Sequence, residues 1–151
     1  MTVLVVLHVL AAMIWVGGMF FAYVVLRPAA GPFEAPARLA LWLRVFASFF
    51  PWVWASIVAL LASGYAMLFF YLGGFANAEL HIHLMQLTGI VMMLLFFHLY
   101  FAPWRRFARA VETEAYEQAG VALGQIRRIV GINLVLGLVT VAMGASGRFW
   151  P

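Results

Sequence analysis

Four long apolar stretches, each about the length needed to cross a membrane, constrain this chain more than any other feature. They run from about 3 to 26, 51 to 72, 80 to 102 and 129 to 146. A spanning helix needs about 20 mainly apolar residues. Only 9% of the 151 residues are charged, whereas a soluble domain carries about 25%. The sequence therefore predicts an all-α integral membrane protein with a single four-helix transmembrane domain, and it argues against nucleic-acid binding.

The positions of the arginines predict how the bundle is oriented. The connections 27–50 and 103–128 lie on one side of the membrane and hold eight of the nine arginines, while the other side holds only Arg148. Positively charged loops stay in the cytoplasm. We therefore expect both connections to be cytoplasmic and both termini periplasmic, in a multi-pass protein of the bacterial inner membrane.

The four histidines are the strongest candidates for a functional site. Ionisable side chains inside a span are costly and usually functional. His8 lies near the outer end of the first span, and His81 and His83 lie near the outer end of the third. His98 lies about 22 Å further along the third span at 1.5 Å per residue. We therefore expect His8, His81 and His83 to share one depth, and His98 to lie apart from them.

Helical geometry separates the two neighbouring histidines of the third span. At about 100° per residue, His81 and His83 point roughly 200° apart. His81 shares its face with Met85 and Met92, whereas His83 shares its face with Leu87. The periodicity does not say which of the two faces points into the bundle.

A b-type haem is the first chemistry that these residues fit. Such a haem takes one axial imidazole from each of two facing helices, with small residues and aromatics around the ring. His8 and His83 meet the depth condition, with His81 as a substitute, and Trp15 and Gly18 lie along the first span. We therefore expect a histidine-ligated haem near the periplasmic face, acting in electron transfer.

Copper is the alternative. Cu(I) favours imidazole together with soft thioether ligands. The metal-ligand candidates at the outer depth are His8, His81, His83 and Met85, and a copper site would use His8, His81 and Met85, with Met92 continuing inward. Both chemistries thus draw on the same outer histidines.

Several small and polar residues are expected to join helices rather than to bind a ligand. Small residues let membrane helices approach closely, and amides and hydroxyls bond between helices. Asn133 and Thr140 are assigned to bonds across helices. The residues assigned to helix packing are Gly17, Gly18, Gly131, Gly137 and Gly144.

Three segments carry a family resemblance. The stretches Leu7–Ala30, Leu80–Gln86 and Phe96–Arg106 resemble the CopD family, the copper-resistance-D type of bacterial inner-membrane protein. The resemblance implies a four-helix membrane protein linked to copper uptake or resistance, often with a periplasmic copper-binding partner.

The chain is also distantly similar to the HemJ-type four-helix haem proteins. His8, followed by Trp15 and the pair Gly17-Gly18, matches their first-helix pattern. This resemblance implies haem b at His8. Besides the membrane lipid, the expected partners are a periplasmic copper or electron carrier, a quinone, or a second copy of the chain in a homo-oligomer.

Overall fold

The computed structural model describes residues 1–149, and within that range every regular element is a helix. Four of the helices are long and apolar enough to cross a membrane. In chain order the elements are α1 (Thr2–Phe20), a π-helical segment (Phe21–Leu26), α2 (Arg27–Ala29), α3 (Ala35–Phe70), a 3₁₀ turn (Phe75–Asn77), α4 (Leu80–Leu99), a second π-helical segment (Tyr100–Trp104), α5 (Arg105–Glu112), α6 (Tyr116–Ser146) and a last 3₁₀ turn (Gly147–Phe149). The all-α prediction and its four long helices are confirmed.

The helices extend well beyond the predicted spans. The second predicted span begins at Pro51, but α3 begins at Ala35 and carries Pro51 in its interior. Proline removes one helical hydrogen bond and usually ends or kinks a helix. Here Phe46 and Phe50, on the preceding turns, are buried and stacked with ring centroids 5.3 Å apart. Phe50 before the proline and Trp54 after it both pack against the Phe96 ring, so contacts with a neighbouring helix hold α3 on both sides of the proline.

Two other prolines lie beside the π-helical segments. Pro28 follows Phe21–Leu26, and Pro103 lies inside Tyr100–Trp104. The proline ring clashes with the carbonyl group of the preceding turn, and a widened turn relieves that clash without breaking the helix. The chain from Thr2 to Ala29 and the chain from Leu80 to Glu112 therefore each continue as one long helix.

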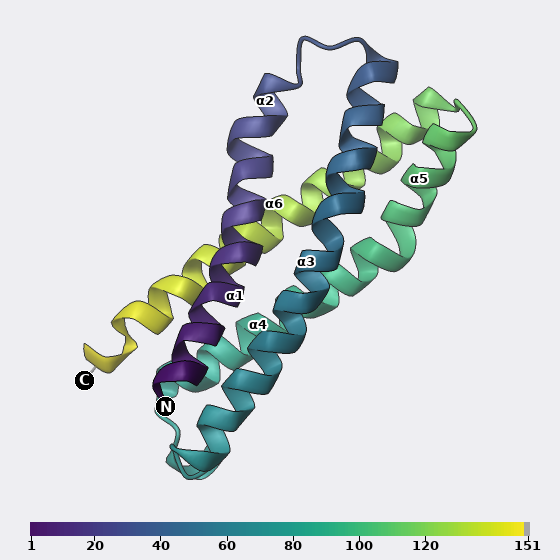
Figure 1. Cartoon of the computed structure of the whole chain (residues 1–151). Helices are drawn as coiled ribbons and strands as arrows, with labels where there is room; N and C mark the ends of the chain where they lie inside the picture. The colour runs from purple at the N-terminus through teal and green to yellow at the C-terminus, as the bar shows by residue number, and fades with distance from the viewer. Residues whose placement is uncertain (150–151) are drawn as a thin grey trace.

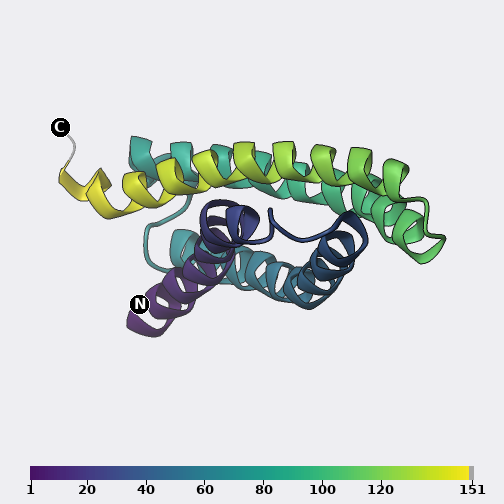
Figure 2. The same ribbon diagram turned by 90° about the horizontal axis from the view of Figure 1, so that it is seen from above.

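The helices are arranged as two pairs. α1 packs mainly on α3, and α4 packs mainly on α6. Seen from above, the two pairs form two layers (Figure 2). Both ends of the described chain lie at the same end of the bundle, together with the connection between α3 and α4 (Figure 1).

A cluster of aromatic side chains joins the two pairs. The Phe50 and Phe96 rings meet edge to face at 5.6 Å, and the Trp54 ring stacks on Phe97 at 5.1 Å. We call the following residues the aromatic cluster: Phe46, Phe50, Trp54, Phe96, Phe97, Tyr100, Trp104 and Phe107. It connects α3 with α4, α5 and the π-helical segment between them.

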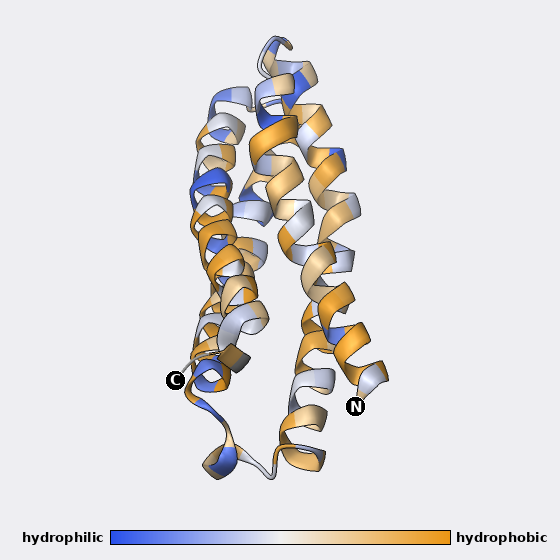
Figure 3. Cartoon of the chain, turned by 90° about the vertical axis from the view of Figure 1, so that its left-hand side faces the viewer, coloured by the Kyte–Doolittle hydropathy of each residue, from blue (hydrophilic) through white to orange (hydrophobic). Residues whose placement is uncertain are grey.

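The outer surface suits lipid rather than water. Large apolar side chains such as Val3, Met13, Val58 and Leu94 are at least 60% exposed. Hydrophobic residues follow all four helices, and hydrophilic ones gather mainly toward the end of the bundle away from the termini (Figure 3). A surface of this kind is stable only where the apolar side chains face hydrocarbon.

The adjacent glycines of α1 provide a matched test of this packing. A Cβ at Gly18 would meet the Phe49 ring, whereas a Cβ at Gly17 would have no atom within 4 Å. We predict that Gly18→Leu lowers the free energy of unfolding by about 1–3 kcal/mol, as overpacking does. Gly17→Leu should cause no loss. Thermal unfolding of both variants in detergent checks this, and equal stabilities would contradict the packing described here.

Candidate functional site

Met85 faces the last turns of α6, and His81 faces the 3₁₀ turn that directly follows α6. A Cβ at Gly147 would overlap the His81 ring, and a Cβ at Gly144 would come within 2.8 Å of the Met85 methyl carbon. The His81 side chain is only 15% exposed, and its Nδ1 lies 3.2 Å from Oε2 of the exposed Glu79. A carboxylate on one ring nitrogen orients a histidine and fixes which nitrogen can bind a metal.

Met92 continues the same face toward the middle of the bundle. It is buried, and its methyl carbon lies 3.1 Å from the position of a Cβ at Gly137. Its sulfur lies 4.0 Å from Oγ1 of Thr140. We call the row His81, Met85 and Met92, with the α6 residues that it contacts, the α4–α6 seam. The row spans about 16 Å along the helix, so it can hold an ion at successive positions but not at all three at once.

Hydrogen bonds hold the two sides of the seam together. The Thr140 hydroxyl lies 2.7 Å from the Thr88 hydroxyl, and the Asn133 amide donates to the Met92 carbonyl at 3.2 Å. The expectation that Asn133 and Thr140 bond across helices is confirmed. Four of the five assigned glycines, Gly18, Gly131, Gly137 and Gly144, are confirmed as close-packing positions, and Gly17 is not, because a Cβ there would have no atom within 4 Å.

The other two histidines of the third long helix do not face the seam. His83 is exposed, and its ring stacks on Phe75, in the connection between α3 and α4, with ring centroids 6.4 Å apart. His98 is also exposed. The structure thus supplies what the periodicity left open: the face of His81, not that of His83, packs against α6.

His8 belongs to the other helix pair. Its Nδ1 lies 2.9 Å from Oγ of Ser63 on α3, and Gly64 leaves room for the ring. The Ser63 hydroxyl donates its proton to the carbonyl of Ala59, so Nδ1 of a neutral His8 is the donor and the lone pair lies on Nε2. Ser63 therefore orients His8 in the way that outer-shell residues orient metal ligands.

The positions expected to surround a haem are occupied by protein side chains. Trp15 is buried and meets Phe96 edge to face at 6.3 Å, and the Phe49 ring covers Gly18. His8 and His83 contact different partners, Ser63 and Phe75. These contacts provide no cradle for a haem, and we derive no chemistry from one. The roles assigned to these residues stay predictions.

The donor set of the seam fits a soft metal ion. Within residues 1–149, no three side chains of His, Cys, Asp or Glu lie close enough to hold a metal ion together. A seam of one imidazole and two thioethers is instead the ligand type that Cu(I) prefers. The arrangement matches the copper alternative better than the haem hypothesis.

Comparison with known families supports the same alternative. A model of the family described as Copper resistance protein D, CopD, matches residues 43–146. The chain belongs to the CopD family. It is a multi-pass inner-membrane protein of the copper-resistance type. The matched region contains both sides of the α4–α6 seam but not α1, which carries His8. No curated protein and no solved structure matches the chain.

Ser63 is the site residue that sequence reasoning missed. It is 1% exposed in the middle of an apolar helix. A buried hydroxyl in a span needs a partner, and that signal was available in the sequence. The identity of its partner, His8, could not be predicted from the sequence, because His8 lies on another helix.

The contact between His8 and Ser63 is testable by a double-mutant cycle. We predict that His8→Ala and Ser63→Ala together destabilise the protein less than the sum of the single variants. The difference should be about 0.6–1.7 kcal/mol, the range measured for such bonds in membranes. Unfolding in detergent measures it, and strictly additive effects would show that the two side chains do not interact.

Proposed function

We propose that the protein binds copper as Cu(I) cargo along the α4–α6 seam, in copper uptake or resistance. The observation that carries the proposal is the shared orientation of His81, Met85 and Met92 toward α6 and the turn that directly follows it. These three side chains form a row of soft donors within the region that matches the CopD family. Thioether and imidazole ligands suit Cu(I).

The outer end of the seam is suited to receive the ion. Glu79 is 71% exposed and lies beside His81, so a carboxylate stands where a cation would approach. The positive-inside rule places this end at the periplasm. We infer that copper arrives at His81 and Met85 from that side, from solution or from a periplasmic copper carrier.

The inner part of the seam has the features of a second position for the ion. Met92 is 3% exposed, and its sulfur lies 4.0 Å from Oγ1 of Thr140. Transfer between weak, successive sites is how membrane pathways combine binding with release. We therefore assign Met85 to the outer of two binding positions and Met92 to the inner one, so that each sulfur contributes to binding.

The methionines of the seam provide the decisive variants. Met→Leu keeps the volume and removes the sulfur, so it costs little stability. We predict that Met85→Leu and Met92→Leu each weaken Cu(I) binding by at least about tenfold, since even outer-shell changes have effects of that size. Competition with a chromophoric Cu(I) chelator measures this in purified protein. Cellular copper content under copper stress measures the same change in the intact system.

Met13→Leu is the matched control, because Met13 lies on α1, outside the α4–α6 seam, and is 63% exposed. It should bind copper as the unmodified protein does. If both seam variants retain copper binding and copper content, the seam does not carry the ion.

The metal content and the absorption spectrum of the purified protein distinguish the copper hypothesis from the haem hypothesis. We predict that protein purified anaerobically from copper-supplemented cells contains copper and shows no Soret band. Metal analysis and an absorption spectrum of one sample, oxidised and dithionite-reduced, give the answer. Near-stoichiometric iron with sharp reduced α and β bands would contradict the copper proposal and restore a low-spin haem.

A further inference from the structure

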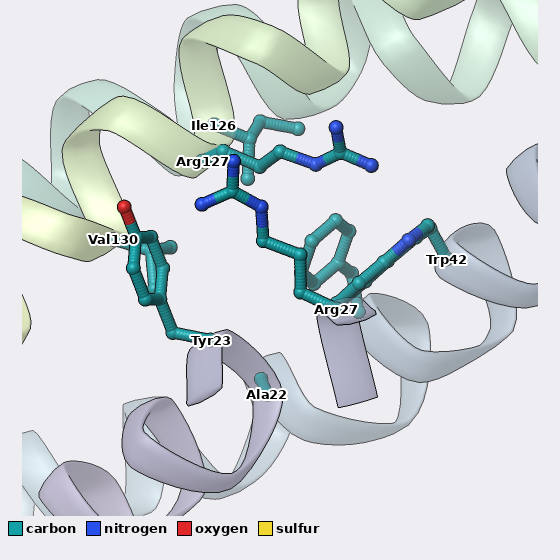
Figure 4. A pocket seen from close by; sticks show the side chains of 8 residues that line it. Ala22, Tyr23, Arg27, Trp42, Ile126, Arg127 and Val130 are labelled. Carbon is teal, nitrogen blue, oxygen red and sulfur yellow. The ribbon is translucent and has the colours of Figure 1, made fainter. Parts of the chain in front are cut away.

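A small pocket at the arginine-rich end of the bundle lies apart from the α4–α6 seam. It lies between the π-helical segment Phe21–Leu26 with α2, α3 and α6, and the guanidinium groups of Arg27 and Arg127 both occupy the space between these elements (Figure 4). The residues that line it are Ala22, Tyr23, Arg27, Trp42, Phe46, Ile126, Arg127 and Val130. Nothing in the copper proposal uses this pocket.

The positive charge of the pocket is not balanced by the protein. Among residues 1–149, neither Arg27 nor Arg127 has a carboxylate within 4.0 Å. Arg38 adds a third positive charge near Arg127. Its own guanidinium donates to the carbonyl groups of Gly31 and Phe33, at 3.4 and 3.1 Å. Like charges held together destabilise one another, so an anion bound among them would be stabilising.

Two buried donors point to the same conclusion. Within the described residues, Nε of Arg127 and Nε1 of Trp42 are buried without a hydrogen-bond acceptor. Trp42 is 3% exposed and lines the pocket. A buried donor left unsatisfied costs about 1–3 kcal/mol. Unpartnered donors in a pocket that also holds two guanidinium groups are the features of a site for an oxyanion.

Aromatic rings hold both arginines in position. The Arg27 guanidinium lies 5.0 Å from the centre of the Tyr23 ring, and that of Arg127 lies 5.9 Å from the centre of the Trp42 ring. Contact with a ring face leaves the N–H edges of a guanidinium able to donate. Tyr23 in turn packs closely on Gly131 of α6. The donors are therefore ordered before any ligand arrives.

We propose that this pocket binds the phosphate group of an anionic ligand, either the headgroup of an acidic phospholipid or free phosphate. Arginine pairs recognise phosphate through paired, charge-assisted hydrogen bonds. Basic pockets between membrane helices at the cytoplasmic side are typical sites for acidic headgroups. Eight of the nine arginines lie at this end of the bundle, which the positive-inside rule therefore assigns to the cytoplasmic leaflet.

The test uses the full-length protein in a neutral detergent. Dioctanoyl phosphatidylglycerol, dioctanoyl phosphatidylcholine and sodium phosphate are titrated separately, and binding is followed by calorimetry. Arg27→Gln and Arg127→Gln remove one charge each from the pocket. Arg128→Gln, at the exposed neighbouring position, removes the same charge outside it.

We expect the unmodified protein to bind phosphatidylglycerol or phosphate and not phosphatidylcholine. Arg27→Gln and Arg127→Gln should each lose at least about tenfold in affinity, the effect of one hydrogen bond to a charged group. Arg128→Gln should stay within about twofold, which a non-specific effect of net charge would not allow. Phosphatidylglycerol binding that phosphate cannot displace identifies a lipid, and displacement by phosphate identifies the free anion.

Three results would overturn the proposal: no binding of either anion, equal binding of phosphatidylcholine, or the same loss in Arg128→Gln as in Arg127→Gln. Arg127→Lys guards against misfolding, because it keeps the charge and the length of the side chain. It should retain the thermal stability of the unmodified protein while losing part of the affinity, since lysine lacks the fork of donors. Full affinity in Arg127→Lys and in Arg27→Gln would also count against the pocket.

Discussion

The packing of aromatic rings between the two helix pairs is the interaction on which the rest of the structure depends. Inside a membrane, lipid solvates apolar side chains as well as another helix does, so helices associate through close packing and hydrogen bonds. Phe50, Trp54 and Phe96 supply that packing between α3 and α4. Elsewhere α1 contacts mainly α3, and α4 contacts mainly α6. Among the described residues, the bonds of His8, Asn133 and Thr140 lie within one pair, the bond from Gln86 of α4 to Tyr65 of α3 joins the pairs, and the histidines are divided between them.

This division explains which parts of the site the sequence predicted. Periodicity along one helix correctly placed His81, Met85 and Met92 on one face and His83 on another, because those directions depend only on the helical repeat. It did not identify Ser63 as the partner of His8, because a neighbouring helix contributes that contact. The unbroken run of α3 through Pro51, where the predicted span begins, likewise depends on tertiary contacts, those of Phe50 and Trp54 with Phe96 of α4.

The haem and copper hypotheses differ in what they require across the bundle. A bis-histidine haem needs two imidazoles that face one another, whereas a row of copper ligands needs only one helix face packed on its neighbour. The sequence predicts that His8 and His83 lie at the same depth along the membrane normal. Two side chains at the same depth need not point toward one another. His8 is hydrogen-bonded to Ser63 of α3, whereas the His83 ring stacks on Phe75, in the connection between α3 and α4. The α4–α6 seam meets the requirement of the copper hypothesis, a single helix face packed on its neighbour. The CopD family match covers both helices that form the seam.

The two proposed sites also bear on one another through charge. A Cu(I) ion that moves inward from Met92 approaches the end of the bundle that holds Arg27, Arg38 and Arg127, none of which has a carboxylate of the described residues within 4.0 Å. In a medium of low dielectric constant, such a group of positive charges repels a cation over long distances. An oxyanion held between Arg27 and Arg127 would reduce that repulsion and satisfy the buried donors at the same time. If both proposals hold, the anion is therefore part of what makes the inner end of the seam accessible to copper, although it never touches the metal.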